Sequence, residues 1–202
     1  MQTTFFKILF IASVFCTLTA CSVFGPVKSD PGKTYVLNAK TQPVTSYPSH
    51  VSLFVAPMDG DLVYNTTQMA YSTQAYQVAY FANNRWAESP TQMLQPLMVQ
   101  TLQKTHHFHA VSSMLSLGGF DYILNTQLIE LNQLFYAHVS QVHLKVRAQL
   151  VSTATNRVIA IKEFSIVENA PQKTPYGGVI AANRATAVFL NQLASFCLQR
   201  LK

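Results

Sequence analysis

The clearest pattern along the chain is a strict alternation of apolar and polar side chains over residues 141–150. Every second position in this run is apolar: Val142, Leu144, Val146, Ala148 and Leu150. Because successive side chains of a β-strand point to opposite faces, this period of two predicts a strand with one face on a core and the other on water. A polar turn at 153–156 and a β-prone run at 157–167 predict that the next strand returns as its hairpin partner.

Shorter β-prone runs precede this hairpin. We expect short strands at 35–37 and 51–55, and a strand pair at 69–71 and 76–81 joined by a turn at 72–75. The run at 122–131 is apolar enough for a further long strand.

Two helices are predicted. Ser89 is a suitable N-cap, and Pro90 fits the first helical position, where proline removes no backbone hydrogen bond. Apolar residues then recur at steps of three and four and form one stripe: Met93, Leu94, Leu97, Met98 and Leu102. Pro96 conflicts with this helix, because an internal proline removes a hydrogen bond and kinks the chain. The second helix is expected at 179–201, with an apolar face made of Val188, Phe189, Leu193, Phe196 and Cys197.

These elements predict the α+β class. We expect a mixed, mostly antiparallel sheet with two main helices packed on one face. The chain has 202 residues, and residues 35–202 are sufficient for one domain with a substantial core.

The N-terminus has the layout of a secretory signal peptide. Lys7 precedes an apolar run at 8–15, and the stretch ends in Leu18-Thr-Ala-Cys21. This ending resembles the lipobox of bacterial lipoproteins, which implies cleavage before Cys21 and diacylglycerol on its sulfur, with an N-acyl lipid on the new terminus. The alternative is an uncleaved membrane anchor, but the run is shorter than the roughly 20 apolar residues that a spanning helix needs. We therefore expect a signal peptide at 1–20 and a lipidated tether at 21–34, which contains Gly25, Pro26, Pro31 and Gly32.

Charge and cysteine content narrow the possible partners. The net charge is +6, and Lys7 is lost with the signal peptide. Since the lysines and arginines form no block, the chain shows no sign of binding nucleic acid.

After removal of Cys16 and lipidation of Cys21, Cys197 remains as a single cysteine, so an intramolecular disulfide is impossible. Cys197 is therefore expected to be a buried apolar residue.

The segment 76–94, which contains Arg85-Trp86 followed by Pro90 and the first helix, resembles the ABC-type transport auxiliary lipoproteins. Weaker matches lie in order along most of the mature chain: Tyr35-Val-Leu37, Phe108-x-x-Val111, Ala148-x-Leu150, Lys162-x-Phe164 and 181–185. The resemblance implies a periplasmic lipoprotein that works with an ABC permease, its ATPase and an MCE-domain protein. Such systems move phospholipid or other hydrophobic compounds between the two membranes. Ser22 after the lipidated cysteine implies the outer membrane, and Pqi-type members are similar to ring-forming homo-oligomers.

Arg85, Trp86 and Tyr80 are the candidate partner-binding residues, since tryptophan and arginine are common at interface hot spots. The alternative is structural: Trp86 packs beneath the first helix, and Arg85 pairs with Glu88 or a carbonyl oxygen. Several aromatic residues lie on the predicted strands or at their ends, and most of them are expected in the core. If some share a groove or a ring lumen, they would offer an apolar surface to an acyl chain or a partner: Tyr71, Tyr76, Tyr80, Phe81, Phe135 and Tyr136.

A histidine cluster, His106-His107-x-His109, permits a metal hypothesis, because imidazole is a common zinc ligand. It has no carboxylate or cysteine nearby in sequence. We favour the alternative that these histidines complement the C-terminus of the first helix, and we expect no metal or other cofactor.

Nothing in the sequence indicates catalysis. The glycine pairs 118–119 and 177–178 lack the spacing of a phosphate-binding loop and are predicted to be turns, the second of them an entry to the last helix. Asp59 and Asp61 lie in a turn with no nearby histidine, and no nucleophile-elbow motif is present. We therefore expect a non-enzymatic outer-membrane lipoprotein that docks an MCE protein, with a lipid-anchored periplasmic hydrolase or an envelope structural lipoprotein as alternatives.

Overall fold

The computed structural model describes residues 32–41, 44, 46–114, 119–136 and 138–201. The predicted signal peptide, Cys21 and almost all of the tether lie outside the described residues. Residues Gly32–Lys202 form one compact unit.

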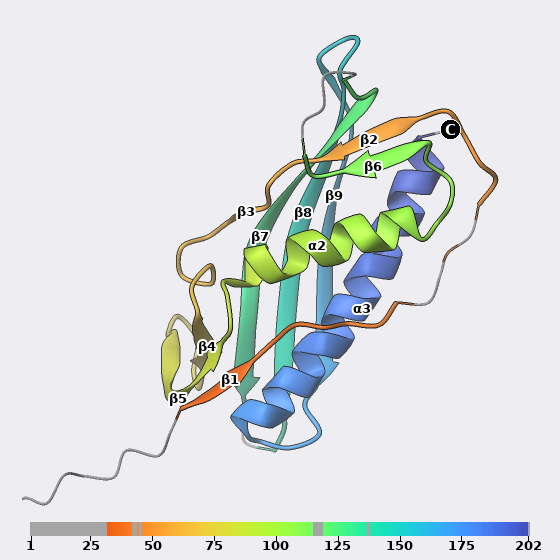
Figure 1. Ribbon diagram of the computed structural model, residues 1–202. Coiled ribbons are helices and arrows are strands. Elements are labelled where there is room, and N and C mark those ends of the chain that lie inside the picture. Colours follow the sequence, from red (N-terminus) through yellow and green to blue (C-terminus); the bar gives the residue numbers. More distant parts are fainter. Residues whose placement is uncertain (1–31, 42–43, 45, 115–118, 137, 202) are drawn as a thin grey trace, which may run out of the picture. The chain divides into compact units, whose positions relative to one another are not determined.

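The elements of this unit follow the order expected for an α+β domain (Figure 1). Five short strands come first: β1 (Lys33–Tyr35), β2 (Ser52–Val55), β3 (Asp59–Gly60), β4 (Gln68–Ser72) and β5 (Ala79–Trp86). Helix α2 (Pro90–Gln103) and strand β6 (Ala110–Ser112) follow. Three long strands and a final helix complete the chain: β7 (Tyr122–Phe135), β8 (Ser140–Ser152), β9 (Arg157–Asn169) and α3 (Pro175–Arg200).

Strand β7 organises the 9-stranded sheet. One edge pairs with β8 in antiparallel orientation along the whole strand. The other edge pairs in succession with three short parallel strands, β2 at its start, β3 in its middle and β4 at its end. Strands β5 and β1 extend the sheet beyond β4, and β6 extends it beyond β2. Most paired residues lie in the antiparallel ladders of β7, β8 and β9, so the sheet is mixed and mostly antiparallel, as predicted.

The alternation predicted for β8 is observed. Its apolar residues, including Val142, Leu144 and Val146, are buried, while Arg147 on the opposite face is exposed. Arg147 forms an ion pair with Glu163 of β9 at 3.1 Å. The helix-facing side of the sheet therefore carries the core, and the other side carries polar and charged groups together with exposed apolar residues of β9 such as Ile161 and Val167.

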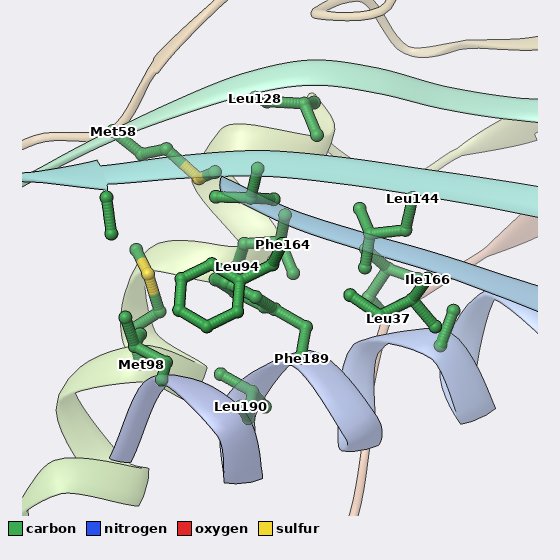
Figure 2. Packing of buried hydrophobic residues seen from close by; sticks show 14 of the residues in the cluster. Leu37, Met58, Leu94, Met98, Leu128, Leu144, Phe164, Ile166, Phe189 and Leu190 are labelled. Carbon is green, nitrogen blue, oxygen red and sulfur yellow. The ribbon is translucent and has the colours of Figure 1, made fainter. Parts of the chain in front are cut away.

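Both helices cover the same face of the long strands (Figure 1). Phe164 of β9 contacts Phe189 of α3 edge-to-face, with ring centroids 5.4 Å apart. Leu94 and Met98 of α2 lie beside them, and Leu37 closes the core from the segment after β1 (Figure 2). Each of these buried side chains contributes roughly 1.5–3 kcal/mol of transfer free energy. Since the buried residues of the described chain include no Asp, Glu, Lys or Arg, apolar packing holds the domain together.

Helix α2 begins where the sequence predicts. The side-chain oxygen of Gln92 accepts a hydrogen bond from the Ser89 amide at 3.2 Å. Pro96 lies inside the helix, which tolerates it because both Pro96 and Gln92 are exposed. The Gln92 carbonyl, which loses its usual partner, is therefore on the solvent side.

Helix α3 begins four residues earlier than predicted, and the glycine pair 177–178 lies in its first turn rather than in a separate turn. Both glycines are required by close contact. A Cβ atom on Gly177 would overlap the backbone carbonyl of Gln172, and one on Gly178 would overlap the carboxamide of Gln133. The pair therefore opens the last helix, as predicted, but it is part of that helix and not a separate turn, because glycine marks a close backbone approach as well as a turn. Gly119, with a φ of 69°, does lie in a turn-like conformation, whereas Gly118 is outside the described residues.

Several strand boundaries also differ from the prediction; strand β7, for example, continues to Phe135 and does not end at 131. The first strand is Lys33–Tyr35 rather than 35–37. Leu37 leaves the sheet because the chain turns across the helices, where the Asn38 amide donates to Asn183 Oδ1 at 2.7 Å. Strand β5 starts at Ala79, three residues after the predicted start, because Tyr76 adopts a left-handed φ of 63° in the turn.

We predict that Gly177→Ala lowers the free energy of unfolding by about 2 kcal/mol, because the new methyl group displaces the backbone of Gln172. Replacing glycine by alanine within a helix ordinarily stabilises it by roughly 0.5–1 kcal/mol, so the sign of the effect is diagnostic. Urea denaturation measures it. Gly32→Ala is the matched control, since its Cβ would make an ordinary 3.6 Å contact with the Asn83 carbonyl oxygen. Stabilisation by Gly177→Ala would contradict the packing of α3 described above.

Candidate functional site

Arg85 and Trp86 are the last two residues of β5, between β1 and β4 in the sheet. Adjacent residues of a strand point to opposite faces. Trp86 accordingly faces the core and is 5% exposed, whereas Arg85 is exposed. The backbone holds this end of the strand firmly, since the Trp86 amide donates to the Thr67 carbonyl and the Ala87 amide donates to the Tyr35 carbonyl.

The indole of Trp86 fills space beside the start of α3. It borders a void of about 10 Å³, together with residues of β4, β7, β8 and α3: Met69, Ala70, Leu131, Asn132, Gln133, Val142, Gly178 and Ala182. Trp86 also belongs to the core cluster that includes Met93 and Leu94 of α2. A void of this size holds at most one water molecule. The burial of Trp86 favours the structural interpretation, because its ring is inaccessible to a partner.

Arg85 and Tyr80 differ from Trp86 in what they can offer to a partner. The predicted ion pair between Arg85 and Glu88 is not formed, since Arg147–Glu163 is the only ion pair among the described residues. Arg85 therefore presents its guanidinium group at the surface. Tyr80 is half-buried, and its hydroxyl donates to the Val63 carbonyl at 2.9 Å.

The structure brings three of the predicted aromatic residues into one cluster. Tyr71 of β4 stacks on Phe81 of β5 with ring centroids 4.5 Å apart, and both contact Phe135 of β7 edge-to-face. All three rings are half-buried. An open hollow of about 390 Å³ lies next to them, between the β4–β5 turn and the end of β7. Tyr76 and Tyr136 are exposed at the same end of the sheet but outside the ring cluster.

The histidine cluster has a structural role. His107 is 6% exposed, and its two ring nitrogens lie 2.6 Å from the Tyr47 carbonyl and 2.8 Å from the Leu201 carbonyl. Leu201 is the C-cap of α3. His107 therefore complements the end of α3. The prediction that it complements the end of the first helix was wrong. His106 follows the C-cap of α2, Lys104, and has a left-handed φ of 53°. Within the described ranges, no three His, Cys, Asp or Glu side chains are grouped to hold a metal ion.

A polar cluster that the sequence analysis missed joins β2 to the start of β7. One carboxylate oxygen of Asp121 accepts hydrogen bonds from the amide and the hydroxyl of Ser52, both at 2.7 Å. These bonds lower the pKa of Asp121 below its ordinary value, and the nearby His109 lowers it further, against a small opposing effect of burial. A lone serine and aspartate 69 positions apart give no local motif, so only the pairing of β2 with β7 reveals this contact.

The other chemically reactive candidates are occupied or shielded. Asp59 accepts from the Gly60 amide, and Asp61 accepts from the Gln127 carboxamide at 3.2 Å; both carboxylates are exposed. Burial raises the pKa of the Cys197 thiol to about 12. Because the thiolate is the reactive form of cysteine, Cys197 behaves as the buried apolar residue predicted from the sequence.

Residues 35–194 match the model of the ABC-type transport auxiliary lipoprotein component. The chain belongs to this family. Membership makes it an auxiliary lipoprotein of ABC-type transport, and hence a membrane-anchored protein of the cell envelope. None of the curated proteins matches the chain.

Two solved structures share the fold of this auxiliary lipoprotein. Protein XCC0632 from Xanthomonas campestris is 16% identical, with a TM-score of 0.76 over 83% of this chain and 96% of that chain. An uncharacterized protein is also 16% identical, with a TM-score of 0.64 over 82% and 98% of the two chains. At this identity the likeness extends to the fold alone. In the part of the chain that the structure describes, no helix is both long and apolar enough to cross a membrane.

We predict that His107→Ala lowers the free energy of unfolding by about 1–3 kcal/mol, because the buried Leu201 carbonyl loses its polar contact with the imidazole ring. Chemical denaturation followed by circular dichroism measures the change. His109→Ala is the control and is expected to have little effect, since its side chain is exposed. Equal effects of the two substitutions would contradict the role assigned to His107.

The carboxyl group of Asp121 is predicted to titrate below 3.8, its ordinary value. Since the folded-state pKa is depressed, the hydrogen bonds from Ser52 stabilise the fold above that pH, and this contribution is lost as the pH falls through the folded-state pKa. NMR titration of the side chain tests this. Ser52→Ala should raise the midpoint, and an unchanged midpoint would show that another group sets it.

Proposed function

We propose that this auxiliary lipoprotein is a non-enzymatic docking component of an MCE-type lipid-transport system. It would be held at the periplasmic face of the outer membrane and bind the MCE-domain protein of an ABC transporter that moves phospholipid or another hydrophobic compound. The observation that carries the proposal is the family match over 35–194, which extends over most of the chain after the lipobox-like Leu18-Thr-Ala-Cys21.

The anchor of the proposal is Cys21, which would carry diacylglycerol on its sulfur and an acyl chain on its nitrogen. Ser22 stands where the sorting signal for inner-membrane retention would require Asp, and this supports the outer membrane. The lipid would attach the domain to the membrane through residues 22–32.

Recognition of the partner would use the exposed side of β5. Arg85 is exposed and has no ion-pair partner among the described residues. Arginine is among the residues most often found at interface hot spots. Tyr80 would contribute through the exposed part of its ring, whereas Trp86 would support the site from beneath by fixing the end of β5.

The proposal assigns ATP hydrolysis to a different subunit, because the chain has no phosphate-binding loop. For the alternative of a lipid-anchored hydrolase, the contact to consider is the one between Ser52 and Asp121. There the serine hydroxyl donates directly to the carboxylate, with no histidine between them to act as a general base. A homo-oligomeric ring would be compatible with docking, since a ring places several copies of β5 around one partner.

We predict that Arg85→Ala weakens binding to the MCE-domain protein about tenfold or more while the melting temperature is unchanged, since truncation of an arginine hot spot costs about 1.4 kcal/mol or more. Pull-down from solubilised membranes and calorimetric melting are measured on the same preparation.

Arg157→Ala is the matched control, because Arg157 is also exposed but lies at the start of β9. Loss of stability with unaltered affinity per folded molecule would refute the role of Arg85. Failure of the unaltered protein to retain any MCE protein would refute the docking function itself.

A further inference from the structure

Three turns and the start of α3 meet at one end of the domain (Figure 1). The hollow of about 390 Å³ is lined by both the β4–β5 turn and the end of β7. The loop between β9 and α3 joins them, since Lys173 Nζ donates to the Tyr136 carbonyl at 3.1 Å and the Ala170 amide donates to the Ser140 carbonyl. We call this the three-turn end, defined by residues 73–78, 136, 138–139 and 170–176.

The three-turn end displays exposed tyrosine and valine side chains. Tyr76, Tyr136 and Tyr176 come from the three different segments, and Val78 and Val139 are exposed in two of the same segments. The sequence at 71–81, 134–141 and 169–176 contains no Asp or Glu. Tyrosine combines an apolar ring with a polar hydroxyl, so it is enriched where one side of a surface is apolar and the other is wet, as at a membrane interface.

Tyr76 is the clearest single indication that this end contacts something outside the domain. It is fully exposed at the tip of the β4–β5 turn and adopts a left-handed φ of 63°. This conformation is unfavourable for a bulky residue. The ring takes part in none of the aromatic contacts of the described domain, so it gains nothing there that offsets the backbone conformation. Its contact is therefore expected outside the domain.

The place where the chain leaves the domain identifies the occupant. Gly32 lies against Asn83, and Lys33 pairs with Asn84, on the side of the sheet that ends in the β4–β5 turn. Tyr35 of the same strand contacts Tyr176, with ring centroids 6.0 Å apart. The 12 residues from Cys21 to Lys33 span at most about 40 Å. Because Tyr176 lies in the first turn of α3, this contact places β1 beside a segment of the three-turn end, and an anchor of this length can hold that end against the membrane.

We infer that the three-turn end lies against the bilayer that holds the lipid anchor, with Tyr76, Tyr136 and Tyr176 at the level of the lipid headgroups. This inference rests on the proposed anchoring at Cys21. The lipid fixes how far the domain is from the membrane, and the tyrosines fix its orientation. The opposite end, which carries the 153–156 turn and the Asp121 carboxylate, then points away from the membrane.

The test uses the full chain, lipidated at Cys21, in vesicles of phosphatidylethanolamine and phosphatidylglycerol. A polarity-sensitive fluorophore is attached at Tyr76→Cys, with Thr155→Cys as the matched control at the opposite end. Cys197 is buried and will not compete for label. Nitroxide lipids are expected to quench the fluorophore at position 76 and shift its emission to the blue, and to leave the one at position 155 as it is in buffer.

Equal quenching at the two positions would overturn the orientation. Shielding of position 76 only on addition of the MCE protein, with no quenching by lipid, would assign this end to a protein partner and also overturn it. Flotation separates this proposal from the previous one. A chain that does not float with vesicles lacks the anchor and both proposals fail, whereas a floating chain without quenching contradicts the orientation alone.

A second variant set tests the tyrosines themselves, with the fluorophore at Val139→Cys. Tyr76→Asn fits the left-handed conformation and removes the ring, so it should lower quenching without lowering the melting temperature. Leu62→Ser is its control, since Leu62 is an exposed apolar residue elsewhere on the domain. Unchanged quenching in Tyr76→Asn, or an equal loss in Leu62→Ser, would overturn the role of the tyrosine.

Discussion

The backbone amide and carbonyl groups of the 14-residue strand β7 need hydrogen-bond partners along both of its edges. The arrangement of the other strands follows from how these partners are supplied. A buried amide or carbonyl without a partner is costly. Strand β8 satisfies one edge continuously, while β2, β3 and β4 share the other. Strand β2 pairs with the start of β7, and β4 pairs with its end. The Asp121–Ser52 contact and the aromatic cluster therefore lie at opposite ends of one strand.

The sequence predicted the elements that depend on local periodicity. The β8–β9 hairpin and helix α2 follow from alternation and capping, so their residues were expected correctly. The short parallel strands were harder, because β3 and β6 hold two and three residues and exist only through pairing with β7 or β2. The role of Gly178 depends on its contact with Gln133, 45 positions away in sequence, which no local pattern reveals.

The same distinction applies to the candidate site. The sequence predicted Arg85 and Trp86 together as partner-binding candidates. In the strand they point to opposite faces, so that Trp86 belongs to the core and Arg85 to the surface. Similarly, His107 was expected near a helix C-terminus, and only the tertiary fold places it at the end of α3. The grouping of tyrosines from three separate turns likewise required the structure. The surface proposed to bind a partner and the surface proposed to face lipid are separate parts of one domain.

A covalent lipid at Cys21 is the most important requirement, because both the proposed orientation of the domain and its docking of an MCE protein need attachment to the membrane. Intact-mass analysis of the native protein purified from membranes tests this directly. We expect a chain that begins at Cys21 and carries the added mass of diacylglycerol and one further acyl group. Unmodified polypeptide that retains residues 1–20, recovered from the soluble fraction, would contradict the account.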